Sequence, residues 1–308
     1  MPDSLQRFIF ENANIRGEIV KLDATWQAIL SRHDYPQSVQ TLLGEMMVAA
    51  ALLSATLKFN GKLIIQIQGG HPIKLMVVEC DSNNHLRAVA QYDDDIQAST
   101  KLSELVGAGK LVITLDPATG GERYQSIVDI TGESLADAIT DYLVRSEQLD
   151  TNIWLAANSK YAAGLLIQKL PNDSASLAKK EPSNQPNISN IETNDQDTWN
   201  RIQHLSSTIT NDELLNISEQ EIIHRLYHEE DVRVFDKEPI SFRCTCSRER
   251  VATMLRSLGS KEVVSIIEEQ KIIKVACEFC NQKYEFDSVD SEQLFASDIP
   301  HTTTSTKH

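Results

Sequence analysis

The stretch "MMVAAALLSATLKFNGKLIIQIQGGHPIKLMVVEC" occupies residues 46–80 and combines an apolar segment with two strand-like segments. Residues 46–57 are too few to span a bilayer and are typical of a buried core helix. "LIIQIQ" (63–68) and "IKLMVVEC" (73–80) have the composition of strands, and the "GGHP" between them is a turn signal. This part of the chain is therefore predicted to form a compact α/β unit.

Further elements are predicted on both sides of this stretch. Strands are expected at 86–92, 110–116 and 123–130, and helices at 36–57 and 134–149. Ser134 is expected to cap the second helix, with Asp137 three residues further on. Residues 1–178 are therefore assigned to one large N-terminal α/β domain.

The composition of the whole chain limits its function. Its 308 residues are 41% hydrophobic and carry a formal net charge of −15. A chain this acidic is a poor general binder of nucleic acid or of anionic membranes. The N-terminus "MPDSLQRFIF" lacks the basic and apolar regions of a signal peptide, so a cytoplasmic location with reduced thiols is expected.

Residues 179–235 are predicted to be a polar linker with a metastable helical region. The composition changes near residue 171, where prolines lie among Asn, Ser and Asp. Residues 197–235 then show intermittent helical periodicity, with apolar residues such as Leu214, Ile222 and Tyr227 among acids. Short amphipathic helices of this kind are stable only while docked on a partner surface.

Four of the five cysteines form two tight pairs, Cys244 with Cys246 and Cys277 with Cys280. Four thiolates from two such pairs are the ligand set of a closed, structural zinc site. The same pairs are also close enough in sequence to form local disulfides, although the C-x-C geometry is strained. Metal binding and disulfide bonding are therefore two possible states of one switch.

The cysteines lie in a predicted C-terminal domain, residues 236–290, followed by a flexible tail at 291–308. "VATMLRSLG" predicts a helix that ends at Gly259, and "SKEVVSIIEEQ" predicts a second with Ser260 as its cap. Strands are expected on both sides of the second cysteine pair. A domain this small has a marginal core, so removal of the metal is expected to unfold it.

The segment "FRCTCSRERVATMLRSLGSKEVVSIIEEQKIIKVACEFCNQKYEFD" (242–287) closely resembles the redox-switch domain of the thirty-three-kilodalton heat-shock protein family, bacterial redox-regulated holdase chaperones. Residues 17–80 and 132–156 resemble the N-terminal domain of the same family. The resemblance implies an α+β protein with a large N-terminal α/β domain, a helical metastable linker and a small C-terminal zinc-binding redox domain.

The resemblance also implies how the protein works. In the reduced form, Cys244, Cys246, Cys277 and Cys280 would bind one Zn²⁺, and the chaperone would be inactive. Oxidation would form the disulfides Cys244–Cys246 and Cys277–Cys280, the latter first, and release zinc. The linker would then unfold, and the protein, as a homodimer, would bind unfolding client proteins without ATP.

Several other residues have the patterns of ordinary structural positions, and two other functions are compatible with the cysteine pairs. Cys80 ends a predicted strand and is expected to be a buried core thiol, while His224 and His228 are expected on a solvated helical face. Residues 107–112 fail the phosphate-loop pattern, and the acidic turn at 92–95 is of an ordinary kind. The alternatives are a thiol–disulfide oxidoreductase and a zinc-ribbon module that binds nucleic acid. We expect this protein to be a chaperone and not an enzyme.

Overall fold

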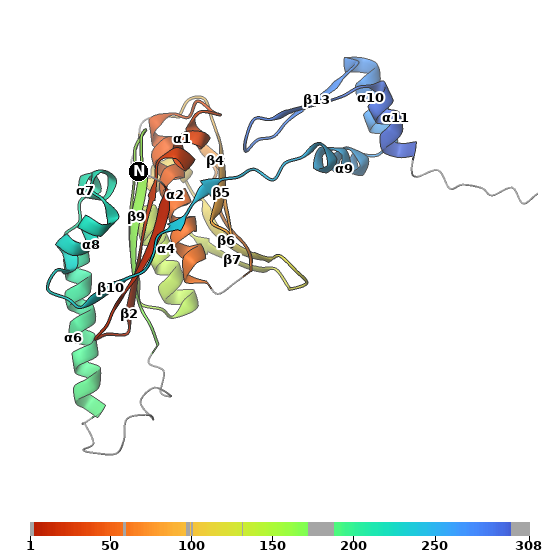
Figure 1. Ribbon diagram of the computed structural model, residues 1–308. Helices are drawn as coiled ribbons and strands as arrows, with labels where there is room; N and C mark the ends of the chain where they lie inside the picture. The colour runs from red at the N-terminus through yellow and green to blue at the C-terminus, as the bar shows by residue number, and fades with distance from the viewer. Residues whose placement is uncertain are drawn as a thin grey trace, which may run out of the picture. The chain divides into compact units, whose positions relative to one another are not determined.

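The computed structural model describes residues 3–57, 60–96, 99, 101–130, 132–171 and 188–296. The chain divides into two compact units, Met1–Arg243 and Cys244–His308. The first unit contains two six-stranded sheets, here called sheet A and sheet B, with helices around them (Figure 1).

Sheet A has the strand order β10-β1-β2-β9-β8, and β11 also pairs with β1. Its strands are β1 (Ser4–Phe10), β2 (Ile15–Leu22), β8 (Thr151–Ala157), β9 (Ala162–Lys169), β10 (Val232–Val234) and β11 (Glu238–Pro239). The sequence patterns did not predict these strands. The reason is visible in β9, where both faces of the strand are buried, so that "AAGLLIQK" shows no alternation of apolar and polar residues.

Sheet B has the strand order β12-β5-β4-β3-β6-β7, and β12 is parallel to β5 while the other neighbours are antiparallel. Its strands are β3 (Gly61–Gln68), β4 (Ile73–Asp81), β5 (His85–Tyr92), β6 (Lys110–Pro117), β7 (Tyr124–Asp129) and β12 (Ser241–Phe242). The five strands from β3 to β7 confirm the five that the sequence predicted. The segment β12 brings the end of the first unit back to the edge of this sheet.

The first unit also contains seven described α-helices and one π-helical segment. They are α1 (Ala24–Leu30), α2 (Gln37–Thr56), α3 (Leu102–Val106), α4 (Leu135–Tyr142), η1 (Leu143–Glu147), α6 (Ile188–Ser206), α7 (Asn211–Asn216) and α8 (Glu219–Tyr227). The predicted helix at 134–149 is therefore two segments, α4 and η1. Its cap is confirmed, because Ser134 and Asp137 form a reciprocal capping box.

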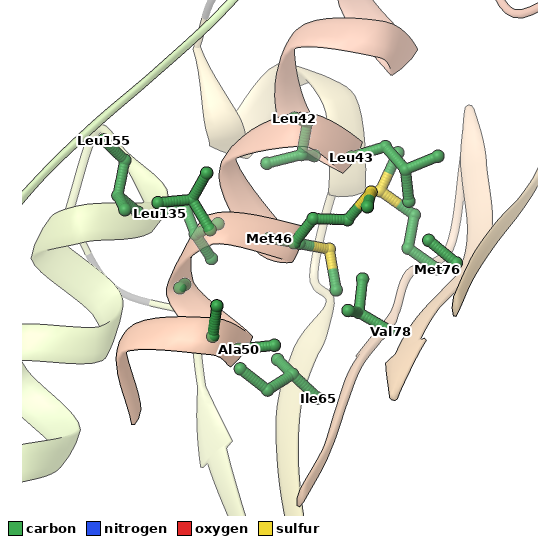
Figure 2. Close-up of a cluster of buried hydrophobic side chains, with 14 of the residues drawn as sticks. Leu42, Leu43, Met46, Ala50, Ile65, Met76, Val78, Leu135 and Leu155 are labelled. Carbon is green, nitrogen blue, oxygen red and sulfur yellow. The ribbon is translucent and has the colours of Figure 1, made fainter. Parts of the chain in front are cut away.

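Helix α2 lies between the two sheets and forms the centre of the main core (Figure 1). Figure 2 shows Met46 and Ala50 of α2 close to Ile65 and Val78 of sheet B. Among the described residues, α2 is the one helix long and apolar enough to cross a membrane, but 67% of its most apolar window is buried inside the protein. It is a core helix, as predicted.

The glycine at position 44 allows α2 to approach sheet A closely. A Cβ atom at Gly44 would lie 2.6 Å from the Cβ of Ala157 on β8. Any larger residue would push the helix away from the strand.

Helices α6, α7 and α8 cover the other face of sheet A (Figure 1). Their buried side chains and those of the sheet form a second apolar cluster, here called the α6–α8 interface. It contains Phe8, Phe10, Ile15, Ile19, Ala156, Ala163, Leu165, Ile167, Trp199, Ile202, Leu214, Leu215, Ile222, Ile223 and Tyr227. The predicted linker thus contains three helices, α6 to α8, that dock through their apolar faces, and a strand, β10, that joins sheet A.

The described residues of the second unit, 244–296, form three helices and a hairpin. Its elements are α9 (Arg248–Leu258), α10 (Ser260–Gln270), β13 (Ile273–Ala276), β14 (Lys283–Phe286) and α11 (Ser288–Ala296). The prediction that Ser260 caps α10 is wrong: Gly259 holds the cap position with φ +90°, and Ser260 is the first helical residue. A backbone with φ > 0 favours glycine, so one residue ends α9 and starts α10. The prediction of a flexible tail from residue 291 is wrong for residues 291–296, which belong to α11 and bury Leu294 in the small core. Residues 297–308 lie outside the described part.

Candidate metal centre

The first cysteine pair lies in the loop that enters α9. Cys244 and Cys246 directly precede Ser247, whose hydroxyl accepts a hydrogen bond of 3.2 Å from the N–H of Arg250. This cap fixes the start of the helix, because it satisfies one of the free N–H groups of the first turn. The cap therefore anchors the loop that presents both thiols.

The second pair lies at the turn of the hairpin β13–β14. The N–H of Cys277 donates to the carbonyl of Gln282 at 2.9 Å, and the N–H of Asn281 donates to the carbonyl of Cys277 at 2.7 Å. Asn281 has φ +57°, a left-handed conformation that Asn adopts more readily than most residues. The turn is thus tight enough to point Cys277 and Cys280 in one direction.

The structure brings the four predicted site cysteines together. Their sulfur atoms all lie within 4.8 Å of one another. The sulfurs of Cys244 and Cys277 are 3.7 Å apart, and those of Cys246 and Cys280 are 3.3 Å apart. A disulfide bond is about 2.05 Å long, and all five cysteines are free thiols.

The crowding of the four thiols changes their acidity in opposite directions. Burial alone would raise the pKa of Cys244, but hydrogen bonds from Cys246, Cys280 and Cys277 lower it to about 7. Burial and the neighbouring sulfurs raise the pKa of Cys280, and burial also raises that of Cys277. One thiolate is therefore stabilised by its neighbours, whereas four thiolates together need a compensating cation.

The arrangement fits a tetrahedral metal ion. Zinc–sulfur bonds of about 2.3 Å place the sulfurs of a tetrahedral site about 3.8 Å apart, close to the observed spacings. The second unit also needs such a cross-link. Among its described residues, the apolar core consists of Ala252, Leu255, Val263, Ile273, Phe286 and Leu294. A core this small gives little stability of its own. The four cysteines could hold a metal ion, and zinc is consistent with them.

Two arginines that follow the first cysteine pair, Arg248 and Arg250, interact with neighbouring side chains. The guanidinium of Arg248 lies 2.7 Å from the carboxylate of Asp290 and 4.2 Å from the ring centroid of Phe286. Arg250 donates to the hydroxyl of Thr245 at 2.7 Å. These contacts hold the loop and α11 in place around the cysteines.

Cys80 is a buried core thiol, as predicted. Its side chain is inaccessible to solvent, and burial raises its pKa to about 12. His224 of α8 and His228, the C-cap residue of this helix, are both exposed, with ring centroids 6.4 Å apart, which also agrees with the prediction.

The acidic turn at 92–95 has a neighbour that the sequence did not reveal. His71 lies 2.7 Å from Asp93, and Asp95 is close by. Lys74 also pairs with Asp93 and neutralises it, so an ion-pair cluster accounts for this exposed group.

The fold and the site define a class of protein: an α+β protein with a separate unit built around four clustered thiols that could hold a metal ion. A family model described as "Hsp33 protein" matches residues 3–287. The 33 kDa chaperonin of Methylobacillus flagellatus is 47% identical over 298 residues, covering 96% of this chain and 96% of that protein. The 33 kDa chaperonin of Nitrosococcus oceani is 44% identical over 306 residues, covering 99% of each.

A solved structure agrees on the fold. The crystal structure of the 33 kDa chaperonin of Thermotoga maritima matches with a TM-score of 0.76 and 19% identity, covering 96% of this chain and 99% of that chain. The chain belongs to the Hsp33 family. The named members of this family are chaperones and not enzymes, which confirms that expectation for this chain.

Proposed function

We propose that this chain is a redox-regulated, ATP-independent holdase that keeps unfolding proteins from aggregating in the cytoplasm. Its family membership and the chaperonin names of its relatives support the chaperone part. The observation that carries the redox part is the gathering of four free thiols within 4.8 Å in a unit with a small core. Such a site responds to oxidants and controls the folding of its unit at the same time.

In the resting, reduced state, Cys244, Cys246, Cys277 and Cys280 are the ligands of one Zn²⁺. The bound ion would neutralise the thiolates and cross-link the loop before α9 to the hairpin turn. The capped helix start and the tight turn hold the thiols in position for this role.

Oxidation joins Cys244 to Cys246 and Cys277 to Cys280. Each disulfide forms when two thiolates give up two electrons; one molecule of hydrogen peroxide takes them with two protons and becomes two molecules of water. Hypochlorous acid can take the same two electrons with one proton and become chloride and water. All four metal ligands are consumed by two such reactions, so the unit loses its cross-link.

The client-binding surface that we propose is the face of sheet A under α6–α8. Helix α7 has six residues and α8 has nine, which is too short for stability in water without docking. Their departure would expose apolar side chains of the α6–α8 interface, including Phe8, Phe10 and Ile19 on the sheet. An exposed apolar patch of this kind binds the apolar segments of unfolding proteins.

The remaining parts of the proposal follow the family resemblance. The domains are residues 1–178 for the chaperone core, 179–235 for the metastable linker, 236–290 for the redox switch and 291–308 for the tail. Strands β11 and β12, within 236–243, pair with the sheets of the first unit, and residues 291–296 belong to α11. The oxidised form acts as a homodimer. The net charge of −15 argues against nucleic acid or anionic membranes as partners.

The test is light scattering from a chemically unfolded client protein diluted into buffer without ATP. The zinc-loaded reduced protein is compared with a sample oxidised by peroxide, and zinc release is followed with a metal-sensitive dye. Suppression of aggregation by the oxidised form alone supports the proposal. Zinc release with no suppression in either form overturns it.

A further inference from the structure

A tyrosine of the second unit reaches across the metal centre. The hydroxyl of Tyr284 donates a hydrogen bond of 3.2 Å to the sulfur of Cys246, 38 residues earlier in the chain. Tyr284 lies on β14, opposite Val275 of β13. The hairpin that carries Cys277 and Cys280 thus also carries a donor for the opposite cysteine pair.

The other three sulfurs accept backbone hydrogen bonds from their own loops, in addition to the thiol–thiol hydrogen bonds within the cluster. The sulfur of Cys244 accepts from the N–H of Cys246, and that of Cys277 accepts from the N–H of Cys280. The sulfur of Cys280 accepts from the N–H of Gln282. Cys246 differs because a phenol hydroxyl, that of Tyr284 on the hairpin, donates to its sulfur.

Hydrogen-bond donation changes the reactivity of a sulfur. A donor withdraws electron density from a thiolate and makes it a weaker nucleophile toward an oxidant. The phenol also occupies one direction from which an oxidant could approach. The reactivity of Cys246 is therefore lowered by the hydroxyl of Tyr284, which a side-chain substitution can remove without changing the backbone.

We propose that Tyr284 is a positioning residue that delays the oxidation of Cys246, so that the Cys277–Cys280 pair closes before the Cys244–Cys246 pair. This inference rests on the proposed function. The delayed step is attack of the Cys246 thiolate on peroxide: a sulfur–oxygen bond forms, the oxygen–oxygen bond breaks, and hydroxide leaves and is protonated to water. The thiol of Cys244 then displaces the sulfenic hydroxyl as a second water, completing the disulfide.

The test uses the full-length, zinc-loaded protein and its Tyr284→Phe variant, which keeps the ring and removes the hydroxyl. Both are treated with peroxide, quenched with an alkylating reagent at successive times and digested, and free thiol at each cysteine is measured by mass spectrometry. We expect Cys246 to lose its thiol faster in the variant, on the order of tenfold, which is the effect of losing one charge-assisted hydrogen bond. The rates at Cys277 and Cys280 should change by less than about twofold in comparison.

A purely structural role would give a different pattern, because general loosening of the unit would accelerate all four cysteines together. That result, or an unchanged rate at Cys246, overturns the inference. Iodoacetamide alkylation of the reduced proteins at zinc saturation is the second measurement, because every ligand sulfur is then a thiolate in both proteins. A selective rise at Cys246 there supports the inference, and equal rates at Cys246 in the two proteins contradict it.

The same experiment separates this inference from the proposed function. If wild-type protein releases no zinc or holds no client after oxidation, the proposed function fails whatever Tyr284 does. If wild-type protein switches and the rate at Cys246 is the same in both proteins, only the role of Tyr284 fails.

Discussion

The carboxylate of Glu219 accepts a hydrogen bond of 2.7 Å from the hydroxyl of Ser4, which lies 215 residues earlier in the chain. The ammonium of Lys237 lies 3.0 Å from the other carboxylate oxygen, and the side chain of Glu219 is only 2% exposed. These contacts join the first residue of α8 to the first strand of sheet A. They are the main polar anchor of the helices that we propose to undock.

Replacement of Glu219 should therefore loosen α8 without oxidation. Glu219→Ala leaves Ser4 and Lys237 without their partner, and we expect a loss of about 1–3 kcal/mol in stability, since Lys237 is partly exposed. The measurement is hydrogen exchange of the amides of α8. The matched control is Glu221→Ala, which removes an exposed carboxylate paired with Arg225. Equal exchange in the two variants would contradict the role of Glu219.

The aromatic cluster under α8 gives a second prediction. Tyr227 is 2% exposed, and its ring centroid lies 5.6 Å from that of Phe8 and 5.0 Å from that of Phe10. Tyr227→Ala should cost about 3–5 kcal/mol, because it opens a large cavity in the α6–α8 interface.

The reduced, zinc-loaded Tyr227→Ala variant should then bind a hydrophobic dye that the reduced wild type does not bind. His228→Ala removes the neighbouring exposed side chain and serves as the control. If dye binding stays at the wild-type level while the variant is folded, α6–α8 do not cover the proposed surface.

Loss of one cysteine pair should unfold the second unit alone. The double variant Cys277→Ser and Cys280→Ser removes two of the four ligands, and a structural zinc site contributes on the order of 10–16 kcal/mol to a small domain. We expect loss of bound zinc and rapid proteolysis after residue 243, with the first unit still resistant. Cys80→Ser changes a buried thiol outside the cluster and should leave zinc content unchanged. Retention of stoichiometric zinc by the double variant would show that the ligands are wrongly assigned.

The stability of the first unit should depend on the protonation of Glu45 in α2. Burial raises the pKa of Glu45 from 4.5 to about 7. The folded state therefore holds this proton more tightly than the unfolded state, and its contribution to stability is present below pH 4.5 and is lost as the pH rises to about 7. Glu45→Gln should raise the free energy of unfolding by about 1–3 kcal/mol at pH 8 and leave it unchanged at pH 4. A gain of the same size at both pH values would contradict this explanation.

The sequence revealed the local features of the site and not the long-range ones. The spacing of Cys244, Cys246, Cys277 and Cys280 was enough to predict that they gather, because ligand pairs on short loops are a local property. The hydrogen bond from Tyr284 to Cys246 depends on how the hairpin meets the loop before α9, and no pattern near either residue indicates it.

The same distinction holds for the fold. Strands β3 to β7 of sheet B were predictable from apolar runs between turn signals, whereas sheet A is buried on both faces by segments distant in the chain. Its strand β9 has no alternation of apolar and polar residues to mark it. The pairing of Ser4 with Glu219 likewise exists only once α8 has docked.

The coupling of thiol oxidation to the release of α6–α8 is tested most directly by hydrogen exchange of residues 199–227, before and after peroxide treatment of the zinc-loaded protein. The amides of β2 and β9 in the same molecule serve as the internal reference. We expect residues 199–227 to lose their protection once both disulfides have formed, while β2 and β9 keep theirs. Unchanged protection of residues 199–227 in fully oxidised, zinc-free protein would contradict the proposed switch.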